Sequence, residues 1–388
     1  MWRPTFTILR KVVFPSIKEN ITLSKLLYST KSRLPRSTAK LTLISASVGV
    51  LVGAGYGGYT HYKINTKKSS ASVENEEYAF LKEAPKYEAH RKVINDADTS
   101  NLQLVLFQYQ TCPFCCKVRA YLDARGVSYE IVEVDAVLRQ AIKWSGYKKV
   151  PILLAKVDGG YQQLLDSTAI VSVLETYLRD KSYQLQDIIK FYPITRFVDD
   201  TGKTTTDVTN KYFIMHNSTV PDEKQRIIES EEREWRQWAD RVLVHTLSPN
   251  VYRTASESLE TFKWFEEAGG WKRTFPSWEC TVMVYVGAAA MWVIAKRLKK
   301  RHNIKEDVRQ SLYDAANDWM KVIHKKGTLF LGGKKPNLAD ISVYGILSSI
   351  EGCQAFQDLR DNTDIGKWFD DMKASMKESR GKVLMLSK

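Results

Sequence analysis

Residues 102–125 read LQLVLFQYQTCPFCCKVRAYLDAR, and this stretch decides the fold because it joins an apolar strand to an amphipathic helix. The strand is predicted over 102–109 and the helix over 113–125, beginning at its proline. Cys112 then occupies the N-cap of the helix, and Cys115 lies about one turn further along. Unpaired amides and the positive end of the helix dipole favour a thiolate there, so we expect the pKa of Cys112 to fall below the roughly 8.5 of a free thiol.

The CPFC tetrapeptide at 112–115 predicts sulfur redox chemistry, with Cys115 placed to resolve a mixed disulfide formed at Cys112. Lys117 and Arg119 offer a way to stabilise the thiolate without a partner thiol. Half of a zinc site and two ordinary buried cysteines are the alternatives. The chain has no second CxxC, and none of its six histidines lies at ligand spacing, so we predict no metal site.

The composition is that of a globular protein of 388 residues, 44% hydrophobic and 26% charged, which is long enough for two domains and an appendage. Five cysteines, three of them clustered at 112–116, favour a reducing compartment over a disulfide framework. The net charge of +14 is uneven, because residues 1–40 hold nine Lys and Arg against the single acid Glu19. No zinc finger, RNP or helix-turn-helix pattern accompanies this charge, so we predict no nucleic-acid partner.

Residues 1–100 predict targeting and membrane attachment. The basic leader 1–40, rich in Ser and Thr, is typical of a mitochondrial presequence, and the basic flank of an anchor in another membrane, such as the Golgi, is the alternative. Residues 41–60 carry no charge over a length that can span a bilayer, so we predict a single transmembrane helix there. An interfacial or cleaved segment is the other interpretation. The polar stretch 61–100 is predicted to be a linker.

Two folded regions are predicted after the linker. Residues 101–180 alternate strand, helix, strand, helix, strand, strand, helix, with strands at 129–134, 149–154 and 161–165, a short helix at 138–144 and a longer helix at 167–179. Residues 181–222 are turn-rich and predict an irregular connector. From 223 to 388 the pattern is helical, with helices expected over 223–246, 257–268, 278–301, 304–325, 337–352 and 365–377.

The second region has two notable helices. The apolar run 280–295 is interpreted as a buried helix rather than a second membrane span, and Arg297 and Arg301 follow it on one basic face. Asn337 to Asp340 has the spacing of a capping box, so a helix is expected to begin there.

Three motifs resemble the thioredoxin fold as glutaredoxins and glutathione transferases use it: TCPFC at 111–115, Val150-Pro151, and Asp166-Ser167. In these families the second motif places a cis-proline beside the active sulfur, and the third holds the γ-glutamyl end of glutathione. Ser167 and free helix amides suit a carboxylate, and Asp166 suits an ammonium, although a plain N-cap is the alternative. The resemblance implies an α/β thioredoxin-like domain followed by an all-α domain like the carboxyl-terminal domain of glutathione transferases.

Longer blocks at 108–123, 234–254, 286–302 and 335–347 resemble the membrane-associated prostaglandin E synthase 2 family. The resemblance implies isomerisation of the lipid endoperoxide prostaglandin H2 to prostaglandin E2, with binding of glutathione and of haem. It implies Cys112 as the essential thiol, with Tyr109 and Phe114 lining its pocket. The residues expected to contact glutathione are Val150, Pro151, Asp166 and Ser167.

The implied reaction suits a thiolate, because the O–O bond of an endoperoxide is weak and a soft nucleophile can open it. Cys112 would attack, Tyr109 could donate a hydrogen bond, and Cys115 would not be needed. Two other functions stay open: a glutathione-dependent thiol-disulfide oxidoreductase, because Cys115 is retained, and a membrane-tethered protein that binds haem or glutathione. His245 is a candidate ligand for haem iron, with a core histidine as the alternative. A homodimer is left open.

Overall fold

The computed structural model describes residues 78–198, 204–215 and 223–386. These residues belong to one compact unit, 73–388. The predicted leader 1–40, the predicted transmembrane helix 41–60 and the first part of the predicted linker lie outside the described residues.

A seven-stranded sheet forms the first part of the fold, in the strand order β1-β6-β5-β3-β4-β2-β9. β3 and β4 run parallel, and their neighbours in the sheet pair antiparallel. A parallel pair needs a crossover connection, and helix α2 (Pro113–Ala124) supplies it. The strands are β1 (Phe80–Leu81), β2 (Arg91–Ile94), β3 (Leu104–Gln108), β4 (Tyr129–Glu133), β5 (Ile152–Val157), β6 (Gly160–Leu165) and β9 (Lys382–Met385).

The sheet is covered on both faces. Successive side chains of a strand point to opposite faces, so Leu104 and Leu106 enter the main core while Val105 and Phe107 enter a smaller one. The main core also holds residues of α2, of α3 (Ser167–Arg179) and of the helical region. The smaller core is closed by the segment around the 3-10 turn η1 (Gln140–Ile142), where a helix over 138–144 was predicted.

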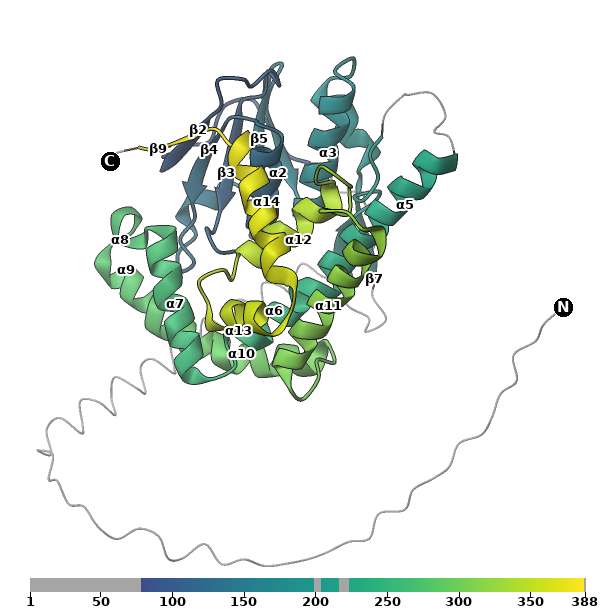
Figure 1. The fold of residues 1–388 in the computed structure, drawn as a ribbon. Helices are drawn as coiled ribbons and strands as arrows, with labels where there is room; N and C mark the ends of the chain where they lie inside the picture. The colour runs from purple at the N-terminus through teal and green to yellow at the C-terminus, as the bar shows by residue number, and fades with distance from the viewer. Residues whose placement is uncertain (1–77, 199–203, 216–222, 387–388) are drawn as a thin grey trace, which may run out of the picture. The chain divides into compact units, whose positions relative to one another are not determined.

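The second part of the fold is helical, and two of its helices, α12 and α14, lie against α2 (Figure 1). α12 begins with the predicted capping box, because Asn337 and Asp340 exchange side-chain and backbone hydrogen bonds. The elements are α5 (Glu223–Trp238), the π-helical η3 (Ala239–Leu243), α6 (Val244–Val251), α7 (Ala255–Gly269), α8 (Trp271–Thr274), α9 (Ser277–Thr281), the π-helical η4 (Val282–Val286), α10 (Gly287–Arg301), α11 (Val308–Lys326), α12 (Leu338–Ser348), α13 (Gln354–Asn362) and α14 (Ile365–Ser379).

The crossing of α12 and α2 is unusually close at Gly345. A Cβ atom at this position would lie 2.5 Å from the Cα of Lys117 and 3.0 Å from the carbonyl oxygen of Cys116. Both are backbone atoms of α2, so only glycine fits. The helical region therefore packs directly on the helix that carries the cysteines.

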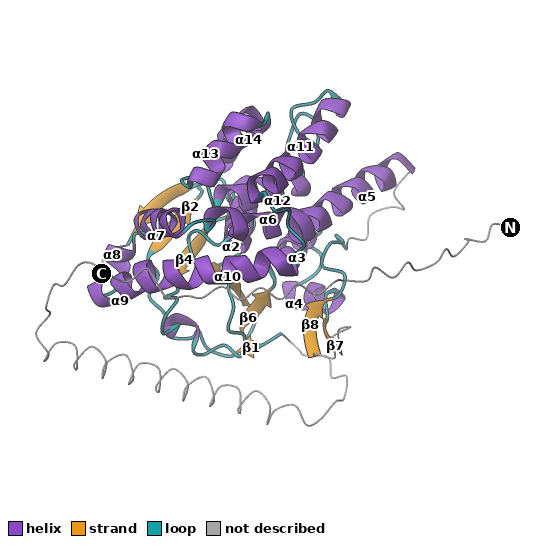
Figure 2. Ribbon diagram, turned by 90° about the horizontal axis from the view of Figure 1, so that it is seen from below, coloured by secondary structure: helices purple, strands orange, loops and turns teal. Residues whose placement is uncertain are grey.

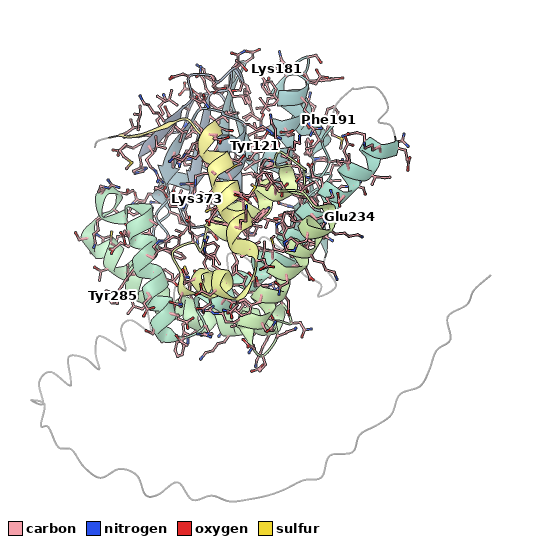
Figure 3. All side chains as sticks on the ribbon, in the orientation of Figure 1. Tyr121, Lys181, Phe191, Glu234, Tyr285 and Lys373 are labelled. Atoms are coloured by element: carbon pink, nitrogen blue, oxygen red, sulfur yellow. The ribbon has the colours of Figure 1, made fainter. Side chains whose placement is uncertain are left out.

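The apolar segment 280–295 is only partly buried, which corrects the prediction of a buried helix. α9, η4 and α10 form one continuous helix, Ser277–Arg301, along the side of the helical region (Figure 2). This helix is long and apolar enough to cross a membrane, and 33% of its most apolar window is buried. Its inner face packs on α7, but Tyr285 and Val286 are 58% and 61% exposed, and Tyr285 stands at the outer edge in Figure 3. A composition that is apolar all round does not tell which face packs.

Three segments gain structure that the sequence did not predict. β1 and β2 fall within the expected linker, and β9 returns the chain from α14 to the sheet. The expected irregular connector contains α4 (Leu185–Ile188), the 3-10 turn η2 (Ile189–Phe191) and the hairpin of β7 (Ile194–Val198) and β8 (Thr204–Val208). β1, β2 and β9 are short and depend on distant partners: β2 pairs with both β4 and β9.

Candidate active site

Cys112 stands where β3 gives way to α2. It is the N-cap of that helix (φ −77°, ψ 125°), and Pro113 is the first helical residue, as predicted. The N–H of Cys112 donates to the carbonyl of Tyr109 at 3.1 Å, which closes the turn before the helix. Cys112 is partly exposed, whereas Cys115 is fully buried one turn further in. Only the first thiol can therefore meet a ligand directly.

The surroundings of Cys112 favour its thiolate. The pKa of Cys112 is lowered, chiefly because the Cys115 thiol donates a hydrogen bond to its sulfur, and burial opposes this shift. Cys112 forms no regular side-chain cap hydrogen bond, but the amides of Cys115 and Phe114 still lower its pKa. Burial, followed by the neighbouring Cys112, raises the pKa of Cys115 well above its ordinary value. The pair thus favours the thiolate form of Cys112 over that of Cys115.

Lys117 does not stabilise this thiolate, contrary to one of the expectations from the sequence. Its side chain is 2% exposed, and Nζ lies 2.7 Å from the Oγ1 of Thr168 and 2.5 Å from an oxygen of Asp240. Burial would raise the pKa of Asp240, but Lys117 and two hydroxyl donors hold it below its usual range. Lys117 therefore ties α2 to the start of α3 and to η3.

Arg119 lies about two turns along α2 from Cys112 and contacts the neighbouring Cys116. Its guanidinium lies 3.0 Å from the Sγ of Cys116 and 2.6 Å from the carbonyl oxygen of Gln110. Its positive charge contributes to lowering the pKa of Cys112, but after the hydrogen bonds named above. Arg119 thus acts on Cys112 as a nearby charge, without a direct contact.

A cavity of about 320 Å³ opens beside α2 and contains every residue that the sequence assigned to glutathione. The Val150–Pro151 bond is cis, as the resemblance implied. Asp166 is the N-cap of α3, and its Oδ1 accepts the N–H groups of Thr168 at 2.8 Å and of Ala169 at 3.2 Å. The carboxylate therefore serves as a helix cap and faces the cavity at the same time. The predicted residues in the lining are Phe114, Val150, Pro151, Asp166 and Ser167.

Eight other residues complete the lining, and sequence reasoning missed them. Lys211 and Asp207 come from the connector, where turn-rich sequence gave no signal for a site, and the Lys211 ammonium lies 3.3 Å from Oδ2 of Asp166. The hydroxyl of Tyr212 donates to Asp240 at 3.1 Å, which joins the connector to η3. The additional residues are Tyr147, Lys149, Thr168, Asp207, Lys211, Tyr212, Asp240 and Arg241.

Tyr109 lies beside the sulfurs but outside the lining of this cavity. It packs at the border of the smaller core, and burial above all raises the pKa of its phenol. The charges of Cys112 and Cys115 act in the same direction. Tyr109 is therefore a protonated phenol at neutral pH and can donate a hydrogen bond near the thiolate.

His245, the candidate ligand for haem iron, lies beside a second histidine. Its imidazole stacks on that of His302, with ring centroids 3.8 Å apart and the planes 12° from parallel. Burial, His302 and Arg301 all lower the pKa of His245, so this place disfavours further positive charge. Among the residues that the structure describes, no group of three or more His, Cys, Asp or Glu side chains could hold a metal ion.

Known proteins with similar sequences cover most of the chain. The glutaredoxin family model matches residues 104–159. Prostaglandin E synthase 2 of Danio rerio is 43% identical over 325 residues, which cover 83% of this chain and 79% of that protein. The Mus musculus protein of the same name is 45% identical over 283 residues, 72% of each chain.

Two solved structures show a distant likeness. The beta-etherase LigF from Sphingobium sp. strain SYK-6 has a TM-score of 0.37 at 19% identity, over 71% of this chain and 98% of its own. Rice GST1 in complex with glutathione has a TM-score of 0.38 at 13% identity, over 73% and 92%. The thioredoxin-like fold of the first region is shown by its sheet order, its cis-proline and the glutaredoxin match.

Proposed function

Since the chain belongs to the prostaglandin E synthase 2 family, we propose that it isomerises the endoperoxide prostaglandin H2 to prostaglandin E2 and that Cys112 supplies the reactive thiolate. Three features together support Cys112 as the reactive residue. Cys112 is the partly exposed cysteine of the CPFC turn, its pKa is lowered, and the cavity that suits glutathione opens beside its helix.

The reaction needs a nucleophile, a proton donor and a base, and no external oxidant or reductant. The Cys112 sulfur forms a bond to one endoperoxide oxygen, the O–O bond breaks, and the other oxygen leaves as an alkoxide and takes a proton. Loss of the hydrogen on the carbon that bears the sulfenyl oxygen then forms the ketone, breaks the S–O bond and returns the thiolate. Tyr109 is the proton donor we propose, because its phenol is protonated and close to the sulfurs.

Glutathione is the cofactor we propose for the cavity beside α2. Ser167, through its hydroxyl and its amide, suits a carboxylate, because the amides of Thr168 and Ala169 are already bound by Asp166. Oδ2 of Asp166, which Lys211 shares, suits an ammonium, and the backbone of Val150 suits the cysteinyl part of the tripeptide. Bound there, glutathione would supply a second thiol beside the helix that begins at Cys112. These residues bind and orient the cofactor, while the isomerisation itself takes place at Cys112.

The test measures two reactions on the full chain in parallel, prostaglandin E2 formation from prostaglandin H2 and turnover of a glutathionylated disulfide. Cys112→Ser should reduce prostaglandin E2 formation to the rate without enzyme. Cys353→Ser is the matched control, because Cys353 is a free, buried cysteine away from the cavity. If Cys112→Ser forms prostaglandin E2 as fast as this control, the thiolate mechanism is wrong.

The thiol-disulfide oxidoreductase is the second candidate function, and the hydrogen bond between the Cys115 and Cys112 thiols favours it. A dithiol reaction requires both sulfurs, whereas the isomerisation requires Cys112 alone. Cys115→Ser therefore separates the two: loss of disulfide turnover with isomerisation retained assigns both reactions to one site. Loss of isomerisation in Cys115→Ser at a pH where its Cys112 still reacts with an alkylating agent would exclude the mechanism above.

We also propose that residues 41–60 attach the chain to a membrane, with the basic leader 1–40 as a mitochondrial address. The support is the uncharged run and the acid-poor leader in the sequence. Imaging the full chain against a chain that begins at residue 41 tests the address. Mitochondrial targeting that is unchanged without the leader would contradict the address, and Golgi localisation of the full chain would favour the alternative.

A further inference from the structure

Lys211 lies between two carboxylates at the edge of the cavity. Its Nζ is 3.3 Å from Oδ2 of Asp166 and also forms an ion pair with Asp207, four residues earlier in the chain. The side chains of Lys211, Asp166 and Asp207 are 17%, 29% and 47% exposed, so all of them can contact a ligand. Together they carry one net negative charge, with positive and negative groups in alternation.

This alternation matches the α-amino-acid end of a γ-glutamyl group. That end carries an ammonium and a carboxylate on one carbon atom, so a site for it needs an acid and a donor side by side. Oδ1 of Asp166 is already occupied by the amides of Thr168 and Ala169, which leaves Oδ2 for an external cation. Lys211 occupies that oxygen in part, so Asp166 by itself is an incomplete ammonium site.

The backbone around Lys211 is held in place from several sides. Its carbonyl accepts a hydrogen bond from the Oγ of Ser172 at 2.5 Å, and Arg236 donates to the carbonyl of Tyr212 at 3.0 Å. The Tyr212 hydroxyl in turn bonds Asp240. The connector therefore presents Lys211 to the cavity from a fixed position, as a binding residue requires.

We propose that Asp207 and Lys211 complete the subsite for the γ-glutamyl end of glutathione, with Lys211 binding its carboxylate and Asp207 sharing its ammonium with Asp166. This inference rests on the proposed glutathione site and names connector residues that the glutaredoxin-like region does not contain. The competing interpretation is a purely structural one, in which Lys211 only fastens the connector to α3.

The experiment is a chemical double-mutant cycle, measured by calorimetric titration of the full chain. The ligands are glutathione, glutaryl-cysteinyl-glycine, which lacks the α-ammonium, and 4-aminobutyryl-cysteinyl-glycine, which lacks the α-carboxylate. The unsubstituted chain should bind each analogue roughly 10- to 100-fold more weakly than glutathione, the range of a lost charge-assisted hydrogen bond. Asp207→Asn should weaken the binding of glutathione but reduce the loss of affinity caused by the missing ammonium. Lys211→Met should reduce the penalty for the missing carboxylate.

The controls are Asp187→Asn and Lys190→Met, which alter an exposed Asp–Lys pair three residues apart and away from the cavity. Both should leave all three affinities unchanged. If the unsubstituted chain does not bind glutathione, the proposed cofactor is wrong. If glutathione binds, two results would refute the subsite and make Lys211 structural. Asp207→Asn and Lys211→Met would either keep the original ratio of affinities between glutathione and the analogues, or lower the affinity for all three ligands by the same factor.

Discussion

Replacing Gly345 with alanine should force the cysteine helix α2 away from α12. The added Cβ would lie 2.5 Å from the Cα of Lys117, 2.8 Å from its amide nitrogen and 3.0 Å from the carbonyl oxygen of Cys116. These are backbone atoms, so no change of rotamer relieves the overlap. Ordinary contact begins at 3.4 Å, so the helices must separate by about 1 Å, the difference between 3.4 and 2.5 Å.

The expected cost combines two opposing effects. Overpacking of a core contact costs roughly 1–3 kcal/mol, and alanine regains up to about 1 kcal/mol of helix propensity over glycine. We therefore expect Gly345→Ala to lower the free energy of unfolding by about 1–2 kcal/mol. Because α2 carries Cys112, a shift of about 1 Å should also slow product formation by up to about 100-fold.

Urea unfolding measures the first effect, and the rate of Cys112 alkylation together with prostaglandin E2 formation measures the second. Gly146→Ala is the matched control, since no atom lies within 4 Å of a Cβ at that position. It should change neither quantity. If Gly345→Ala unfolds at the same urea concentration as the unsubstituted chain and its Cys112 reacts at the same rate, the argument from close packing is wrong.

Three other predictions concern charge. Cys115→Ala should raise the pKa of Cys112, because the largest contribution to its lowering is the hydrogen bond from Cys115, and an alkylation profile that keeps its position on the pH axis would contradict this. Asp240→Asn should cost about 3–5 kcal/mol in urea unfolding, because it leaves the buried Lys117 ammonium without its counter-ion, and a cost near zero would mean that water reaches Lys117. Burial and the Asp135 carboxylate raise the pKa of Glu279 above 4.5 in the folded protein. The proton on Glu279 therefore stabilises the folded state fully below pH 4.5, and this stabilisation is lost as the pH rises through the raised pKa. Glu279→Gln should remove that loss, which thermal melts at pH 4.5 and 8 of the variant and the unsubstituted chain would show as a smaller pH dependence in the variant.

The parts of the fold that the sequence predicted are those with local signals. β3 is an apolar run, α2 starts at Pro113 and α3 starts at its cap Asp166, so neighbouring residues are enough to define each element. β2 and β9 carry no comparable signal. Each has four residues, and they pair with each other from opposite ends of the described chain. Their strand conformation comes from tertiary pairing, which a local pattern does not contain.

The same division holds for the site. Phe114, Val150, Pro151, Asp166 and Ser167 come from the three motifs and line one cavity, because the thioredoxin-like order of elements brings them together. Cys112 and Cys115 are not in its lining. Lys211 and Asp207 were missed because the connector that carries them lacks periodicity. Lys117 was assigned to the thiolate from sequence proximity, but five residues rotate a helix by about 140° away from Cys112. Its side chain therefore points to Asp240 instead.

The contacts of α2 make the helical region part of the sulfur site. Two of them come from outside the glutaredoxin-like region: Gly345 packs against the α2 backbone, and Asp240 neutralises Lys117. Without Asp240, the ammonium of Lys117 would be buried beside Thr168 with no counter-charge, and the start of α3, which forms one wall of the cavity, would lose that link to α2. A change in α12 or η3 should therefore alter both the reactivity of Cys112 and the affinity for glutathione. Coupling of this kind distinguishes a site built on two packed regions from a glutaredoxin-like region that only carries a helical appendage.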